Sequence, residues 1–161
     1  MNDITSYMLE QTKKILSIDS PTGFTAHAAE YVLGAYKKLG YDAKLTNKGG
    51  IFVCVNDGPD QADDPADAPI LLEAHMDTLG GMVCSINEKG RLMLSALGGM
   101  NPNNAEAENC KVYTKSGKVY DATFQLENAS VHVNGEYSDT KRTYETMAVS
   151  YTHLRAHETL M

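Results

Sequence analysis

Hydrophobic residues recur every three or four positions through residues 1–40, which is the spacing of one face of an α-helix. A first helix is predicted over residues 3–17, with Asp3 as its N-cap. Its apolar face comprises Ile4, Tyr7, Met8, Ile15 and Leu16. The segment Ser20-Pro21-Thr22-Gly23 ends this pattern, and a second helix is predicted from a cap at Thr25 to just before Gly40. Its buried face is expected to contain Ala28, Tyr31, Val32, Ala35 and Leu39.

Two β-type segments follow at residues 43–46 and 51–56, and the glycine-containing link 47–50 between them is a hairpin signal. The next segment, 57–67, is rich in aspartate and proline, which is typical of a solvated connector. Residues 69–74 are then apolar at nearly every position, as in a central strand covered on both faces. The order helix, helix, strand, strand, strand predicts an α/β layer structure.

The pattern changes after Leu79, where helical spacing gives way to short strand-like runs separated by turns. The expected strand pairs are 82–86 with 91–94, and 111–114 with 119–126. Val131-His132-Val133 alternates in the same way and predicts a further strand, on which His132 is a face position rather than a metal ligand. This region is typical of a small β-barrel or sandwich, so a domain boundary is placed near Gly80-Gly81.

Composition narrows the class of protein. The chain has 161 residues with 42% hydrophobic and 22% charged, which is globular composition, and its net charge of -7 argues against a nucleic-acid partner. It has neither an apolar run long enough for a bilayer nor a basic and apolar leader, so we expect no membrane partner and a cytoplasmic location. Cys54, Cys84 and Cys110 are odd in number and widely spaced, and they are expected to be reduced, buried thiols.

A histidine and an aspartate stand two residues apart at the end of the predicted central strand, in Glu73-Ala74-His75-Met76-Asp77. Residues two apart on a strand face the same side, and open α/β sheets bind ligands at the C-terminal ends of their strands. Imidazole suits zinc and similar metals, and a ligand histidine usually gives its other N–H to a carboxylate. His75 is therefore a candidate metal ligand, and Asp77 a candidate for orienting it. A structural histidine at a strand end fits the same three residues.

Four short stretches along residues 1–147 form a recognisable pattern, and one of them contains His75. They are Ser20-Pro21-Thr22-Gly23, Gly49-Gly50, Ala74-His75-Met76-Asp77-Thr78-Leu79-Gly80-Gly81-Met82-Val83 and Leu97-Gly98-Gly99-Met100-Asn101-Pro102. Together they resemble metallopeptidase family forty-two, the glutamyl and deblocking aminopeptidases, in the order expected for that family. The stretch around His75 is the most specific of the four.

The resemblance implies a fold in two parts. Residues 1–79 would be the N-terminal part of the metallopeptidase α/β sheet domain. Residues 80–147 would be all or part of the small β-barrel domain that the family inserts into that domain. The inserted domain serves assembly in the family and helps limit access to the active site. The chain is thus expected to be a truncated, N-terminal fragment of the family's fold.

The resemblance also implies an activity. Family members release N-terminal residues from peptides with two adjacent divalent metal ions, zinc or cobalt, that activate a water, and they form homo-oligomers. His75 matches the first metal-ligand histidine, and Asp77 the catalytic aspartate that orients it. Thr78 stands where the family usually has glutamate. The remaining ligands and the general base lie downstream in the family and match no position here, so the fragment is expected to be inactive.

Two alternatives stay open at this point. One is a related zinc carboxypeptidase or deacylase, which shares a strand-end His-x-Asp, although the β-type sequence after His75 favours the aminopeptidase. The other is a non-catalytic β-domain interaction module, in which His75 is structural.

The last segment differs in origin from the rest. Residues 149–159, Val-Ser-Tyr-Thr-His-Leu-Arg-Ala-His-Glu-Thr, resemble the translation of a transposase adapter used in sequencing libraries. We therefore expect the natural sequence to stop at Met147 and residues 148–161 to be an adapter-derived tail. His153 and His157 have the spacing of a helical metal pair, but they are given no part in a mechanism.

Overall fold

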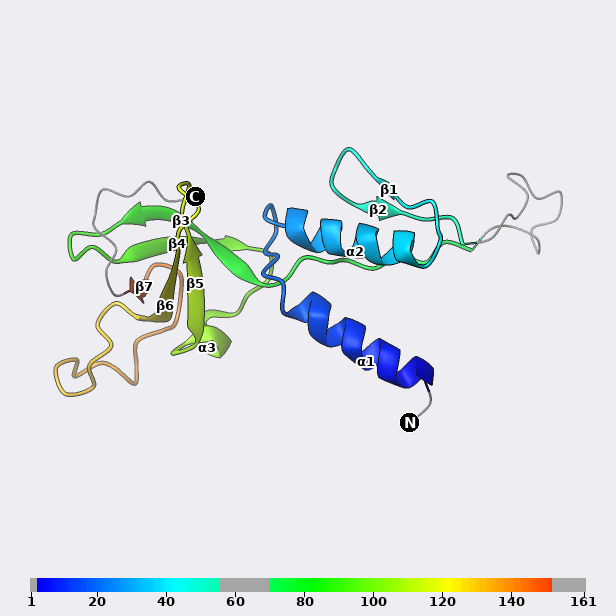
Figure 1. Ribbon diagram of the computed structural model, residues 1–161. Coiled ribbons are helices and arrows are strands. Elements are labelled where there is room, and N and C mark those ends of the chain that lie inside the picture. The colour runs from blue at the N-terminus through cyan, green and yellow to red at the C-terminus, as the bar shows by residue number, and fades with distance from the viewer. Residues whose placement is uncertain (1–2, 56–69, 152–161) are drawn as a thin grey trace. The chain divides into compact units, whose positions relative to one another are not determined.

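The computed structural model describes residues 3–55 and 70–151, and it divides into two compact units between Thr78 and Leu79. The first unit contains two helices and a short hairpin, and the regular structure of the second consists of strands and one short helix (Figure 1).

Both helices of the first unit lie where the hydrophobic spacing predicts them. Helix α1 covers Asp3–Leu16, and α2 covers Ala26–Lys38 with Thr25 at its N-cap position. Gly40 follows α2 with a φ of 91°, a left-handed conformation that suits glycine and ends the helix. Strands β1 (Lys44–Leu45) and β2 (Ile51–Phe52) then pair antiparallel, which confirms the expected hairpin in a shorter form.

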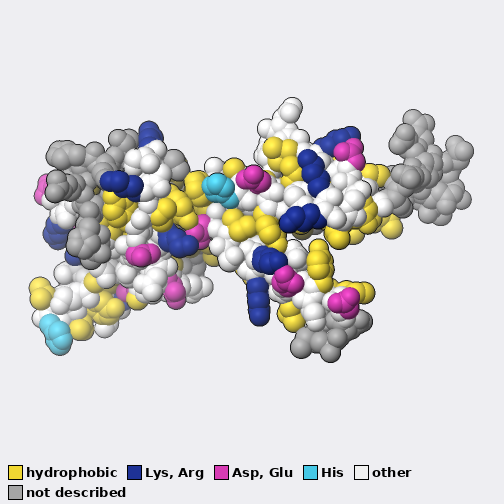
Figure 2. Space-filling view, viewed as in Figure 1, with side chains coloured by type: hydrophobic (Ala, Val, Ile, Leu, Met, Phe, Trp, Pro, Cys, Tyr) yellow, Lys and Arg dark blue, Asp and Glu magenta, His cyan; other side chains and the backbone are white. Residues whose placement is uncertain are grey.

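The apolar faces of the helices are less buried than expected. On α2, Ala28 and Ala29 are buried, but Leu39 is 56% exposed. On α1, Ile4, Met8 and Leu16 are all exposed, and Figure 2 shows hydrophobic side chains at the surface of both helices. The expected burial is wrong for Leu39, and the apolar face of α1 is exposed as well, because among the described residues each helix has little to pack against except the other helix and the hairpin.

The expected central strand over residues 69–74 does not form. Residue 69 lies outside the described residues, and residues 70–74 have no strand structure. Ile70, Leu71 and Leu72 are 88%, 76% and 90% exposed. A strand needs neighbours to accept its backbone hydrogen bonds and to cover its faces. In the described part of the chain, the only β-type pairing near this run is an isolated parallel bridge between Pro21 and Thr78.

The second unit is one antiparallel sheet of five strands in the order β3-β4-β7-β6-β5. The strands are β3 (Gly80–Ile86), β4 (Leu92–Leu97), β5 (Asn109–Tyr113), β6 (Val119–Leu126) and β7 (Met147–Tyr151), with the single-turn helix α3 (Pro102–Ala105) between β4 and β5. The two expected hairpins, β3 with β4 and β5 with β6, are both present. With the helical first unit, this sheet gives the expected α/β class.

The sheet curls around one hydrophobic core (Figure 1). Burial alternates along β6, so that Ala122, Phe124 and Leu126 face inward, as period-two patterning requires. Leu92 of β4 and Met147 of β7 are fully buried in the same cluster. The core of the second unit is therefore formed by the inner face of its own sheet.

The segment between β6 and β7 contradicts one prediction. Val131, His132 and Val133 lie in a turn rather than a strand, and all three are exposed. Alternating sequence alone could not make a strand here because the neighbouring strand β6 already pairs with β5 on one side and β7 on the other. His132 is therefore not a sheet-face residue.

The cysteines and the last segment differ in part from expectation. Cys110 is partly buried, whereas Cys54 and Cys84 are exposed, so the prediction of three buried thiols is wrong for two of them.

Residues 148–151 of the adapter-like segment lie in β7. Residues 152–161, with His153 and His157, lie outside the described residues. None of the described helices has the length and hydrophobicity needed to cross a membrane.

Candidate active site

His75 and Asp77 are in direct contact at the end of the first unit. The His75 Nδ1 atom lies 3.0 Å from Asp77 Oδ1 and 3.0 Å from the backbone oxygen of Asp77. A carboxylate and a carbonyl can only accept hydrogen bonds, so Nδ1 must carry the proton. In the neutral ring, the lone pair is then on Nε2. This is the tautomer that leaves Nε2 able to bind a metal.

The imidazole is accessible as well as oriented. The side chain of His75 is 85% exposed, and that of Asp77 is 39% exposed. Packing therefore does little to hold the ring, and its contact with Asp77 has to fix its orientation. The two residues are only two positions apart in the chain, and the segment that carries them has no strand structure, so they do not meet by sharing one face of a strand.

Asp77 has a second hydrogen-bond partner. Thr22 donates from Oγ1 to Asp77 Oδ2 over 2.7 Å, so the two carboxylate oxygens each have a separate partner. The hydrogen bond from Thr22, followed by that from His75, holds the pKa of Asp77 below its ordinary value. The carboxylate is thus ionised and committed to two hydrogen bonds, which suits an orienting role better than direct metal coordination.

Among the described residues, His75 has too few metal-ligating side chains around it to form a metal site. In the ranges 3–55 and 70–151, no three His, Cys, Asp or Glu side chains are arranged so that they could hold a metal ion together. His27 and His132 are both exposed, and neither belongs to such a group. One imidazole on an orienting carboxylate is less than the three or four protein ligands of a catalytic or structural zinc site.

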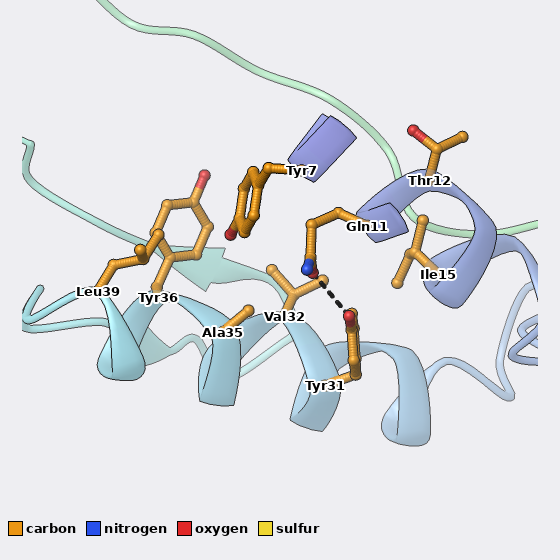
Figure 3. Close-up of a pocket in the computed structure, with 9 residues that line it drawn as sticks. All are labelled: Tyr7, Gln11, Thr12, Ile15, Tyr31, Val32, Ala35, Tyr36 and Leu39. Atoms are coloured by element: carbon orange, nitrogen blue, oxygen red, sulfur yellow. Dashed lines mark hydrogen bonds between the residues drawn. The ribbon is translucent and has the colours of Figure 1, made fainter. Parts of the chain in front are cut away.

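A groove of about 360 Å³ separates α1 from α2 in the first unit. Figure 3 shows Tyr7, Gln11 and Ile15 of α1 facing side chains of α2 across it. Tyr31 donates from its hydroxyl to Gln11 Oε1 over 2.7 Å, which links the helices across the groove. The lining is largely apolar and includes neither a carboxylate nor a histidine, so this groove has no groups for acid–base or metal chemistry.

A comparison of this sequence with models of known protein families identifies the family of the chain. The model of the M42 glutamyl aminopeptidase family matches residues 50–158, which is more than half of the chain and includes His75 and Asp77. The chain belongs to the M42 glutamyl aminopeptidase family. The resemblance expected from the sequence is therefore confirmed.

Two curated relatives are aminopeptidases by name. "Putative aminopeptidase YhfE" of Bacillus subtilis (strain 168) is 34% identical over 141 residues, covering 88% of this chain and 39% of that protein. "Glutamyl aminopeptidase" of Lactococcus lactis subsp. cremoris (strain MG1363) is 31% identical over 112 residues, covering 69% of this chain and 30% of that protein. The M42 chain thus spans well under half the length of both relatives.

Solved structures show the same fold. A TET aminopeptidase from the archaeon Thaumarchaeota archaeon SCGC AB-539-E09 has a TM-score of 0.71 at 18% identity, covering 98% of this chain and 40% of that one. PhTET1-12s, a dodecamer in its asymmetric unit, has a TM-score of 0.73 at 20% identity, covering 94% of this chain and 41% of that one. At these identities the likeness establishes the fold alone.

The sequence indicated His75 and Asp77 as candidate site residues, but it did not indicate that Thr22 contacts Asp77. Thr22 lies 55 residues before Asp77, and no spacing rule connects two residues so far apart. The only signal was that Ser20-Pro21-Thr22-Gly23 is one of the four stretches that carry the family resemblance.

Proposed function

We propose that this chain is the N-terminal part of a metal-dependent aminopeptidase that releases N-terminal residues from peptides. The observation that carries the proposal is the His75–Asp77 contact, in which the proton sits on Nδ1 and Nε2 remains available. The family match favours this activity over a carboxypeptidase, a deacylase or a non-catalytic module.

Each of the two residues has a distinct part in this proposal. His75 binds one of two divalent cations, zinc or cobalt, through Nε2. Asp77 keeps the ring in the tautomer and orientation that this bond requires. When bound, such a metal pair supplies an activated water at neutral pH and polarises the peptide carbonyl. The other ligands and the general base belong to the part of the relatives that this chain does not span.

The donor chemistry fits this group. A neutral imidazole nitrogen is a preferred ligand of zinc and cobalt, and the 85% exposure of the His75 side chain leaves it accessible to an ion and to residues outside this chain. The carboxylate behind the ring is the usual partner of a metal-bound histidine. The described residues thus fit one ligand position of a larger centre.

The two units have different parts in the proposed enzyme. Residues 1–79 belong to the peptidase domain, and residues 80–147 form the inserted β domain, with the segment from 148 onward derived from an adapter. Homo-oligomerisation is proposed from the dodecameric arrangement of PhTET1-12s. Peptides are proposed as substrates because both curated relatives are named aminopeptidases.

The test uses the uninterrupted gene. The full-length enzyme should hydrolyse aminoacyl anilides, lose activity to a chelator and regain it with zinc or cobalt. His75→Ala should lower kcat/KM by at least about 100-fold, because a ligand to the metal is lost. His27→Ala, at an exposed histidine of the same unit, is the matched control and should keep full activity. Chelator-insensitive turnover, or an active His75→Ala enzyme, would refute the proposal.

The 161-residue chain alone should give no metal-dependent turnover of the same substrates. The reason is that one histidine and one aspartate provide too few ligands to hold two cations, with no general base beside them. Turnover by this chain that disappears in His75→Ala would contradict the expectation.

A further inference from the structure

The turn formed by residues 20–23, called here the 20–23 turn, is hydrogen-bonded to the segment that carries the candidate site. Ser20 donates from Oγ to the backbone oxygen of Met76 over 3.0 Å, and the Thr78 amide donates to the backbone oxygen of Ser20 over 2.9 Å. Pro21 and Thr78 form a parallel bridge at the same place. Two segments far apart in the sequence are therefore aligned residue by residue.

The 20–23 turn is itself well defined. Ser20 is only 1% exposed, and the Phe24 amide closes the turn by donating to the Pro21 oxygen over 2.7 Å. Gly23 has a φ of 86°, a left-handed conformation that a residue with a side chain would rarely adopt. This fixed backbone holds Thr22 opposite Asp77.

Asp77 needs a second partner in order to orient a histidine. The carboxylate torsion of aspartate is broad and roughly two-fold, so one hydrogen bond leaves the plane of the carboxylate free to rock. The ring it serves is exposed and receives little support from packing. Thr22 engages Oδ2 at 2.7 Å while His75 engages Oδ1 at 3.0 Å, so the two contacts together define the carboxylate plane.

We propose that Thr22 is a positioning residue of the aminopeptidase site, which acts through Asp77 to fix the ring of His75 with Nε2 directed away from the carboxylate. The inference rests on the proposed function for its enzymatic consequence. Its structural part, the relay from Thr22 to Asp77 to His75, belongs to this chain with or without a metal. This role of Thr22 accounts for the presence of the 20–23 turn among the stretches that resemble the family.

The first test needs no bound metal and uses the full-length protein after its metal has been removed with a chelator. Thr22→Val keeps the shape of the side chain and removes the hydroxyl, whereas Thr22→Ser keeps the hydroxyl. Nitrogen-15 NMR of the His75 ring, at a pH where imidazole is neutral, reports which nitrogen carries the proton. The Nδ1–H tautomer should dominate in the parent chain and in Thr22→Ser, and its fraction should fall in Thr22→Val.

Thr25→Val is the matched control for the first test. Thr25 lies three residues from Thr22, and its side chain makes no capping hydrogen bond, so the same chemical change should leave the ring of His75 as it was. An unchanged tautomer fraction in Thr22→Val would overturn the proposal. A change of equal size in Thr25→Val would do so too, because it would show a general effect on the fold.

The second test uses the full-length enzyme and a metal-binding readout. Cobalt affinity, followed by the visible absorption of the bound ion, should be 10- to 100-fold weaker in Thr22→Val, as is typical when a partner of a ligand histidine is disturbed. Thr22→Ser should restore it. A loss that serine does not restore would indicate a steric role and overturn the proposal.

The two tests separate the two proposals. If the enzyme proves not to be a metalloaminopeptidase, the tautomer change in Thr22→Val should still occur, and only the cobalt and activity arms fail. If the relay is wrong, the enzyme should depend on metal and on His75 while Thr22→Val leaves both the tautomer and the cobalt affinity unchanged.

Discussion

In the second unit, Glu106 and Arg142 form a bidentate ion pair. Arg142 donates from Nε to Glu106 Oε2 over 2.8 Å and from Nη2 to Oε1 over 3.1 Å, and its Nη1 donates to the backbone oxygens of Tyr137 and Thr140. Its guanidinium also lies 4.8 Å from the centroid of the Tyr137 ring. A single arginine thus fastens the long connection between β6 and β7 to residue 106, next to α3.

This pair makes the stability of the second unit depend on pH. The Arg142 guanidinium holds the pKa of Glu106 below its ordinary value. A lowered folded-state pKa contributes stability above the unfolded-state pKa, about 4.3 for glutamate, and loses it as the pH falls through the folded-state value. The second unit should therefore become less stable as the pH falls below about 4.3.

Urea denaturation of the parent chain and Glu106→Gln tests this prediction. At pH 7 the variant should unfold at lower urea, because the charge-assisted bidentate pair is lost, and the difference should shrink in acid. Glu88→Gln, in the exposed turn between β3 and β4, should match the parent at both pH values. If Glu106→Gln kept the full pH dependence of the parent, another group would have to be responsible for it.

At the scale of elements, a strand forms where another strand lies beside it to accept its hydrogen bonds. Val149 of β7 pairs with Leu92 of β4 on one side and with Phe124 of β6 on the other, and it is only 3% exposed. Residues 70–74 are just as apolar, yet they have no such neighbours among the described residues and stay exposed. A neighbouring segment decides whether a strand forms, because the backbone of a strand makes its hydrogen bonds to other segments. The backbone of a helix makes them within the helix itself.

The contact between β6 and β7 should dominate the stability of the second unit. Leu126 pairs with Met147 and is 1% exposed, so Leu126→Ala should cost about 2–5 kcal/mol of unfolding free energy. Hydrogen exchange of the β6 and β7 amides measures the loss. Val131→Ala, at a position 61% exposed, should change it by less than about 0.5 kcal/mol. Equal effects of the two substitutions would mean that the sheet core is elsewhere.

At the scale of the whole molecule, the first unit exposes large apolar side chains in two places. Ile70, Leu71 and Leu72 are nearly fully exposed in an unpaired segment, and Ile4, Met8 and Leu16 are exposed on α1. An unpaired apolar segment of this kind is a template for association with another chain. We therefore expect the 161-residue chain to be poorly soluble and to self-associate.

Light scattering coupled to size exclusion tests this expectation. The double variant Ile70→Lys with Leu72→Lys should shift the chain towards monomer, because charge on an unpaired segment opposes edge pairing. The matched control is Val131→Lys with Val133→Lys, which changes two exposed valines in the turn segment of the second unit and should leave the self-association in place. A parent chain that stayed monomeric at high concentration would contradict the prediction.

The sequence by itself determined the elements whose causes are local. The bounds of α1 and α2 follow from hydrophobic spacing and from Gly40, and the hairpins follow from glycine-containing turns between alternating runs. The pairing of His75 with Asp77 was also predictable, since two residues so close in sequence can meet without help from the rest of the fold. The family resemblance was also readable from short, contiguous stretches, and the family model that matches residues 50–158 confirms it.

Only the tertiary structure decided the features that depend on distant partners. The sequence alone could not show that Thr22 reaches Asp77 across 55 residues, that Met147–Tyr151 lies at the centre of its sheet, or that 70–74 stays unpaired. The physical reason is common to all three. Hydrogen bonds between segments, and the burial of one face of a segment, depend on the other segments that pack against it. The sequence pattern of a segment specifies only its own donors, acceptors and apolar side chains.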